Sequence, residues 1–140
     1  MTREDCGSGR YQTHIYSNGY LAKTTCVWGD DGSGTTTYTW SNGNMVKEVS
    51  EWEYNNTHSE TTYTYTYGNV ENKLNVNIFN DFYDVELLVF NGTRIKNLPT
   101  SYTWSDGETE TYSYTYDDDG YPIKRVTNDG GSSVTTITYY

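Results

Sequence analysis

Glycine residues that follow asparagine or aspartate punctuate this 140-residue chain at regular intervals. Both central residues of a type I′ hairpin turn need a positive φ angle, and Asn-Gly and Asp-Gly pairs meet that requirement. Seven of the 13 glycines stand in such pairs. They predict hairpin turns at Asn18-Gly19, Asp31-Gly32, Asn42-Gly43, Asn91-Gly92, Asp106-Gly107, Asp119-Gly120 and Asp129-Gly130.

Three weaker turn signals fill the longer gaps, at Asn55-Asn56, Tyr67-Gly68-Asn69 and Asn80-Asp81. Successive turns then lie about 10 to 15 residues apart, which is typical of consecutive strands in an all-β domain. Helix signals are nearly absent, because no segment has a sustained 3.6-residue apolar period. The sequence therefore predicts an all-β fold, an antiparallel up-and-down meander of about 10–11 strands.

The turns group into repeating units. In each unit a strand ends in an aromatic residue, a turn follows, and a lysine comes next. The strands are residues 35–40, 61–67, 85–90, 109–116 and 134–140, with 10–16 as a leading half-unit. The lysines are Lys23, Lys47, Lys73, Lys96 and Lys124, at intervals of 24, 26, 23 and 28 residues.

Alternation within the strands predicts which face is buried. In residues 61–67 tyrosine occupies positions 63, 65 and 67 and threonine the positions between them, and residues 112–116 repeat this. We expect the aromatic face to be buried and the threonine face to be solvated. The strand at 82–90 is apolar on both faces, so it should be covered on both sides. Pro99 should lie at an edge or a bulge.

An apolar sheet face must be buried, and without helices the sheet must curl on itself. Two shapes satisfy this requirement: a strongly curved open sheet or half-barrel, and a closed two-layer barrel. We favour the open form, with tyrosines on its concave side. Its N-terminal edge would carry Arg10 and His14, whereas its C-terminal edge ends in Tyr139-Tyr140 without protecting charges. Pairing of edge strands into a dimer is therefore a further expectation.

Composition and charge exclude several classes of protein. The formal net charge of -10 has the wrong sign for a nucleic-acid binder. The longest apolar run, residues 87–90, is far shorter than the ~20 residues of a transmembrane helix. Few aliphatic residues are present, but 16 Tyr and 4 Trp supply apolar area that disordered chains lack. We predict a flexible N-terminal tail over residues 1–9 and one folded domain over residues 10–140.

The start of the chain leaves two questions open. Cys6 and Cys26 either form one disulfide that pins the tail or remain free thiols. Residues 1–5 do not resemble a secretory leader. We interpret the chain as a trimmed mature form with an added Met1.

The unit at 114–126, Tyr-Thr-Tyr-Asp-Asp-Asp-Gly-Tyr-Pro-Ile-Lys-Arg-Val, resembles the tyrosine–aspartate repeat of large secreted bacterial shell proteins and teneurins. Over about residues 10–140 the chain is similar to a family of small Bacteroidota lipoproteins of unknown function. The resemblance implies a porin-like curved meander, exported and lipid-anchored outside the cytoplasm, in the periplasm or at the cell surface. It supplies no catalytic residue. The chain departs from the family in having Asn for Asp in the turns of units two and three, and no lipobox before Cys6.

Catalytic and metal-binding patterns are weak. The two histidines, His14 and His58, accompany no nucleophile motif. Most acidic residues lie in predicted turns or in the exposed-looking run Glu48, Glu51 and Glu53, where solvated carboxylates are common. The acidic segment 117–120 fails the EF-hand pattern, because position 126 is Val rather than Glu. We therefore expect no enzyme, no catalytic residue, no cofactor and no metal site.

The aromatic side chains allow two interpretations. They form the core, since the chain has few other large apolar residues, or they line a concave ligand site. The candidate ligand-binding residues are Trp28, Trp40, Trp52, Trp104, Tyr65 and Tyr114. The sequence predicts a non-enzymatic, extracytoplasmic binding or structural module of the bacterial envelope, with a glycan or an envelope protein as partner. The alternative is a carbohydrate- or small-hydrophobe-binding protein that uses an aromatic-lined concave face.

Overall fold

The computed structural model describes residues 1–73 and 95–138, which form one antiparallel sheet. Each strand pairs with its neighbours in chain order, so the described strands run from β1 to β10 without a crossover and the sheet stays open. The predicted all-β meander is confirmed. The strands are β1 (Thr2–Gly7), β2 (Arg10–Ser17), β3 (Tyr20–Trp28), β4 (Gly32–Ser41), β5 (Asn44–Tyr54), β6 (Thr57–Glu71), β7 (Asn97–Trp104), β8 (Thr109–Tyr116), β9 (Pro122–Asn128) and β10 (Ser132–Thr136).

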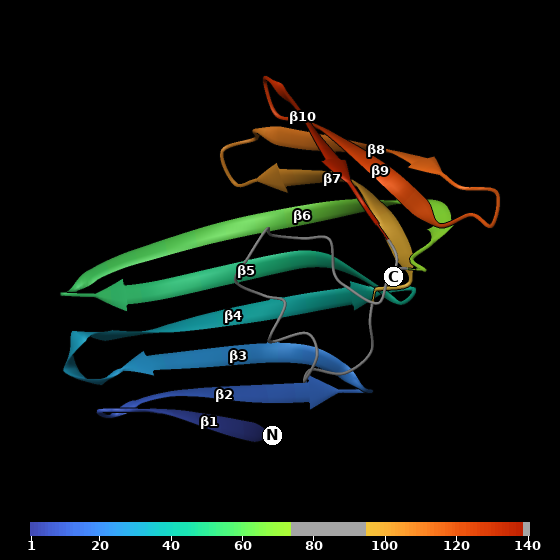
Figure 1. Ribbon diagram of the computed structural model, residues 1–140. Helices are drawn as coiled ribbons and strands as arrows, with labels where there is room; N and C mark the ends of the chain where they lie inside the picture. The colour runs from blue at the N-terminus through green and yellow to red at the C-terminus, as the bar shows by residue number, and fades with distance from the viewer. Residues whose placement is uncertain (74–94, 139–140) are drawn as a thin grey trace.

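The sheet bends beyond its sixth strand. Figure 1 shows β1 to β6 lying side by side in chain order, coloured from blue to green. Strands β7 to β10, coloured orange to red, follow beyond β6 and run in a changed direction. A sheet of this many strands cannot remain flat, because each strand twists relative to its neighbour.

Three hairpin turns have the backbone that the sequence predicts. Asn18 and Gly19 have φ values of 52° and 83°, and Asn42 and Gly43 have values of 52° and 82°. The paired φ values of Asn55 and Asn56 are 50° and 61°. Positive φ at both central residues is the signature of the type I′ turn, whose twist matches that of the strands it joins.

Five predicted turns differ in detail. At Asp106-Gly107, Asp119-Gly120 and Asp129-Gly130 only the glycine has a positive φ, so these turns are not of type I′. The turn predicted at Asp31-Gly32 is replaced by the short 3-10 helix η1 (Gly29–Asp31) just before it. Gly32 is the first residue of β4. At residues 67–69 there is no turn, because β6 continues to Glu71. Register shifts flank Tyr67 there, so Gly68 marks an irregularity within a strand rather than its end.

The segment predicted as an N-terminal tail contains strand β1. Ser8 and Gly9, with φ values of 56° and 74°, form a turn that folds β1 back onto β2. The guanidinium group of Arg3 stacks over the ring of Tyr11 on β2, at 4.1 Å from its centroid. The N-terminal edge strand is therefore β1, and the strand that carries Arg10 and His14 lies one position inside the sheet.

Some predictions lie outside the described residues. They are the turns at Asn80-Asp81 and Asn91-Gly92, the strand at 82–90 and the terminal Tyr139-Tyr140.

A one-residue bulge recurs beside four of the turns or connections. In β2–β3, β4–β5, β6–β7 and β8–β9 the register slips by one residue next to an aromatic side chain. The slip sets each aromatic residue opposite a residue of the inner face, in the pairs Tyr16–Leu21, Trp40–Met45, Tyr67–Pro99 and Tyr116–Pro122. In each pair the extra residue lies on the second strand, so the bulge turns Leu21, Met45, Pro99 and Pro122 onto the inner face opposite the aromatic side chain. The prediction that Pro99 lies at a bulge is confirmed.

The inner face of the sheet carries the core. Met45, Tyr65 and Ile95 are buried together, and Tyr38, Trp40, Tyr63, Tyr67 and Tyr102 pack against them. Leu98, Pro99 and Pro122 are the most completely buried side chains. On the opposite face Thr64 and Thr66 are exposed, as the alternation predicts.

Cys6 and Cys26 are free thiols in the structure. They lie on β1 and β3, with β2 between them. Two strand spacings amount to ~9.6 Å, beyond the ~7 Å that a disulfide can bridge between Cα atoms. Burial raises the pKa of the Cys26 thiol.

Candidate functional site

All six predicted ligand-binding side chains lie on the inner face. Cross-strand partners share a face, and the register pairs Trp52 with Gly34, Trp40 with Met45, and Trp104 with Tyr63. The residues do not form one site, however. They divide into a tryptophan stack at one end of the strands, a buried core, and a pocket at the opposite end.

The tryptophan stack consists of Trp28 and Trp52. Their rings lie 4.8 Å apart and nearly parallel, with an interplanar angle of 12°. The Trp52 ring lies directly on the backbone of Gly34, because a Cβ atom there would be 1.9 Å from the ring atom Cε3. Glycine at position 34 is therefore a packing requirement of the stack.

Tyr65 belongs to the core and not to an open site. It is 7% exposed, and its hydroxyl donates a hydrogen bond to Oε2 of Glu48 at 3.1 Å. Burial, together with the Glu48 carboxylate, raises the pKa of Tyr65 well above its ordinary value. Its ring also packs against Tyr102, which in turn contacts Trp104 edge-on at 4.3 Å.

Tyr114 also has a structural contact. Its hydroxyl donates to the carbonyl oxygen of Pro99 at 2.9 Å and so ties β8 to the bulge of β7. Burial raises the pKa of Tyr114, against the lowering effect of the Arg125 charge. Arg125 is buried on the same face and lies over the ring of Tyr112, 5.4 Å from its centroid.

A line of small polar groups crosses the inner face between the tryptophan stack and the pocket. His14 Nδ1 and Thr24 Oγ1 are hydrogen-bonded at 3.1 Å, and Thr36 and Ser50 are bonded at 3.0 Å. These four side chains are all buried. Burial lowers the pKa of His14, although Glu4 opposes the shift. Each group has a hydrogen-bond partner, which is what burial of polar side chains requires.

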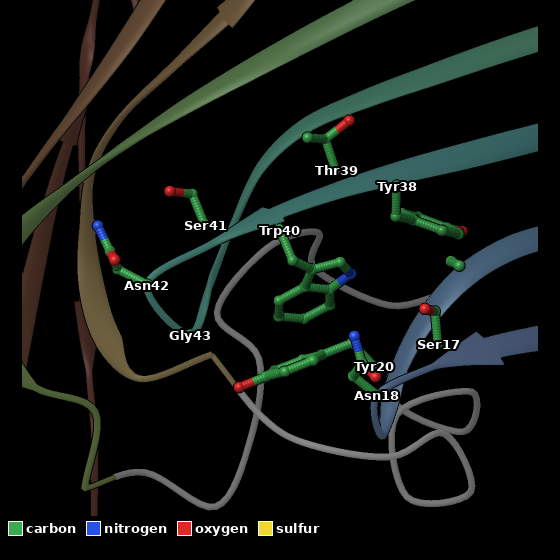
Figure 2. Close-up of a pocket in the computed structure, with 10 residues that line it drawn as sticks. Ser17, Asn18, Tyr20, Tyr38, Thr39, Trp40, Ser41, Asn42 and Gly43 are labelled. Carbon is green, nitrogen blue, oxygen red and sulfur yellow. The ribbon is translucent and has the colours of Figure 1, made fainter.

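The pocket lies where two hairpins end side by side (Figure 2). The turn between β2 and β3 and the turn between β4 and β5 share the sequence Ser-Asn-Gly. Between them is a cavity of about 400 Å³, within the size range of small-molecule sites. It is lined by Ser17, Asn18, Tyr20, Ala22, Tyr38, Thr39, Trp40, Ser41, Asn42 and Gly43.

Two aromatic rings give this pocket its shape. Figure 2 shows Trp40 and Tyr20 facing each other between the turns. Their centroids are 4.6 Å apart at an interplanar angle of 35°. The indole Nε1 of Trp40 donates to the carbonyl oxygen of Leu21 at 2.7 Å, so the ring is held in a fixed orientation. A Cβ atom added at Gly43 would lie 3.2 Å from the Cβ atom of Lys96, so the Lys96 side chain packs closely against this turn.

Among the described residues none that lines the pocket is charged, although the chain carries 19 acidic residues and the Lys96 side chain lies beside Gly43. Its polar groups are two amides, several hydroxyls and backbone groups of the turns. Such groups donate and accept hydrogen bonds without electrostatic preference for a cation or an anion. The arrangement suits a neutral, hydroxyl-rich ligand that stacks one face on an aromatic ring.

Sequence reasoning identified Trp40 but missed the rest of the pocket. The sequence analysis assigns Asn18 and Asn42 only to turns and Tyr38 only to a strand, and it does not single out Tyr20. The signal that could have found them is the repeated Ser-Asn-Gly turn preceded by an aromatic residue, at residues 16–19 and 40–43. Pairing of β3 with β4 then brings the two turns to the same end of the sheet.

The described residues 1–73 and 95–138 lack two features, a metal-ligand cluster and a membrane-spanning helix. No group of three His, Cys, Asp or Glu side chains in these ranges could hold a metal ion. No helix in them has the length and apolar character needed to cross a membrane.

Comparison with known proteins identifies a shared fold. No protein-family model and no curated protein sequence matches the chain. Among solved structures, the chain is similar to a porin-like protein from Bacteroides uniformis, with a TM-score of 0.58 and 20% sequence identity. The match covers 91% of this chain but 58% of that protein, so the chain spans little more than half of its length. The likeness shows that the two share a β fold.

Proposed function

We propose that this protein is a non-enzymatic binding module of the bacterial envelope, and that the pocket between the Ser-Asn-Gly turns holds a neutral carbohydrate. The observation that carries the proposal is the lining itself. Its described residues combine aromatic rings with amide and hydroxyl groups and include no charged side chain, on a chain whose formal net charge is -10.

The chemistry of sugars explains why this combination matters. A pyranose ring presents apolar C–H groups on its faces and hydroxyl groups around its rim. The C–H face stacks on an aromatic ring such as Trp40, and the rim hydroxyls bond to amides such as Asn18 and Asn42. A ligand with a carboxylate or an ammonium group would find no opposite charge in the lining.

Two lines of support bear on location and on the absence of catalysis. The porin-like neighbour from Bacteroides uniformis and the resemblance to exported Bacteroidota lipoproteins both favour an extracytoplasmic place at the envelope. In the part of the chain that the structure describes, the pocket lining offers no carboxylate or imidazole group that could act as a general acid or base. We therefore propose binding without turnover.

Calorimetric titration of the protein with a panel of neutral oligosaccharides tests the proposal. The informative variant is Asn18→Asp, since Asp-Gly also suits a type I′ turn but places a carboxylate in the pocket. The matched control is Asn55→Asp, because Asn55 has a similar φ of 50° in a turn that does not line the pocket.

We expect saturable binding of at least one neutral glycan, at least tenfold weaker in Asn18→Asp and unchanged in Asn55→Asp. A response to fatty acids or other small hydrophobes alone would contradict the carbohydrate proposal and favour the second ligand class predicted from the sequence. Equal weakening in both variants would show that the effect comes from charge on the whole chain and not from the pocket.

A further inference from the structure

The two edges of the sheet differ in how they are protected. The exposed strand β1 carries Arg3, Glu4 and Asp5, and its register is broken by a bulge between Asp5 and Gly7. Charged side chains and bulges are the devices by which proteins prevent a sheet edge from pairing with another chain. Strand β10, Ser132–Thr136, has neither, because its register with β9 is unbroken and its five residues are uncharged and exposed.

The hydrogen-bonding groups of β10 alternate between its neighbour and the open side. Next to the last pair of this ladder, Thr136 and Lys124, the Ile137 N–H donates to the carbonyl oxygen of Ile123 at 2.9 Å. By the alternation of an antiparallel ladder, the N–H and C=O groups of Ser132, Val134 and Thr136 point away from β9. Among the described residues no strand pairs with that side of β10.

We infer that this edge pairs with the same edge of a second copy of the chain. A two-fold axis at Val134 sets Val134 of one copy opposite Val134 of the other, and Ser132 opposite Thr136. Each outward N–H then meets an outward C=O, and every cross-strand pair is uncharged. The equivalent pairing of β1 with itself about Glu4 would place the two Glu4 carboxylates in contact, which is unfavourable.

The charges near β10 do not oppose the approach of a second copy, although the chain as a whole is acidic. Strands β9 and β10 carry Lys124 and Arg125 and no acidic residue, and Asp129 lies in the turn between them. The negative charge that repels two copies is therefore concentrated elsewhere. A contact of one short strand buries less area than the ~1,200 Å² of a stable interface. The pairing should thus be weak and concentration-dependent.

Sedimentation velocity over a range of protein concentrations tests this inference, with two variants of one residue. Val134→Pro removes only an outward N–H and leaves the β9 ladder intact. Each dimer then loses two hydrogen bonds, so dimerisation should weaken about 30-fold. The control Val134→Thr keeps a neutral, strand-forming residue and should dimerise like the parent protein.

Amide hydrogen exchange locates the contact independently of the variants. The amides of Ser132, Val134 and Thr136 should gain protection as the protein concentration rises, whereas amides of β1 should not. A parent protein that remains monomeric at millimolar concentration would overturn the inference. So would a dimer that persists unchanged in Val134→Pro, or one whose added protection falls on β1.

Discussion

The indole ring of Trp52 lies on the backbone of Gly34, its partner on the neighbouring strand, with no space for a side chain between them. Trp28 stacks on the same ring. The absence of a side chain at Gly34 therefore allows Trp52 and Trp28 to stack at this end of the inner face.

Gly34→Ala should therefore lower the free energy of unfolding by about 1–3 kcal/mol, the usual cost of overpacking. The added methyl would meet the flat ring of Trp52, which cannot move without disturbing Trp28. Gly68→Ala is the control, because Gly68 is also a strand glycine but its added Cβ would make only ordinary contacts, the nearest at 3.4 Å. Urea denaturation followed by tryptophan fluorescence measures both. Equal stability of the two variants would contradict the packing assignment.

Tyr65→Ala should cost about 3–5 kcal/mol of stability, since it removes a large buried ring from the core. Tyr65→Phe keeps the ring but leaves an oxygen of Glu48 without its hydroxyl donor, so a smaller loss of about 1–3 kcal/mol is expected. Thermal or chemical denaturation of the parent protein, Tyr65→Phe and Tyr65→Ala gives the order of their stabilities. If Tyr65→Ala folds normally, the ring is not core.

Alkaline pH should unfold the protein through its buried tyrosines. Burial raises the pKa of Tyr65, Tyr67, Tyr102, Tyr112 and Tyr114 above the ordinary value of 10.0. A tyrosine whose pKa is raised on folding stabilises the folded state fully at pH values below its unfolded pKa. This contribution is lost as the pH rises from the unfolded pKa through the folded pKa. Stability should thus hold up to about pH 10 and fall beyond it.

Absorbance at 295 nm, which reports phenolate, measures this titration. Part of the tyrosine signal should appear in one cooperative step together with loss of the β-sheet circular dichroism signal. Smooth titration of all 16 tyrosines near pH 10 with the sheet intact would contradict the burial of these rings.

Asn42 holds a positive φ of 52° in the turn that borders the pocket. Asn42→Val should destabilise the protein by about 1–2 kcal/mol, because a β-branched residue is strained in that conformation. Asn42→Gly should be nearly neutral, and Ser41→Val, one residue earlier in β4, controls for added apolar surface. Equal melting temperatures for Asn42→Val and Asn42→Gly would show that the turn adopts another backbone.

Much of the fold could be predicted from the sequence, because the turns are encoded locally. Asn-Gly at residues 18–19 and 42–43 specifies a backbone that few other pairs adopt, and the Tyr–Thr alternation at 61–67 specifies a face. A glycine that does not follow Asn or Asp was a misleading turn signal. Gly68 lies inside β6, where the Tyr67 hydroxyl bonds to the carbonyl of Met45 and the strand continues to Glu71.

The N-terminal strand and the pocket could not be predicted in the same way. Three of residues 2–7 are charged, and the segment has no apolar alternation that would mark a strand. It pairs with β2 through the turn at Ser8-Gly9. The pocket depends on which turns meet at one end of the sheet, and this is a consequence of register. Trp40 itself was recognisable, but its partners Tyr20 and Asn18 required the structure.

The four indole N–H signals in a heteronuclear NMR titration test the carbohydrate proposal most directly. Only Trp40 lines the pocket, whereas Trp28, Trp52 and Trp104 lie elsewhere on the inner face and serve as internal references. On addition of a neutral oligosaccharide that binds, we expect a saturable shift of the Trp40 signal and little change in the other three. A shift confined to Trp28 and Trp52, or no shift at Trp40 with a glycan that binds by calorimetry, would contradict it.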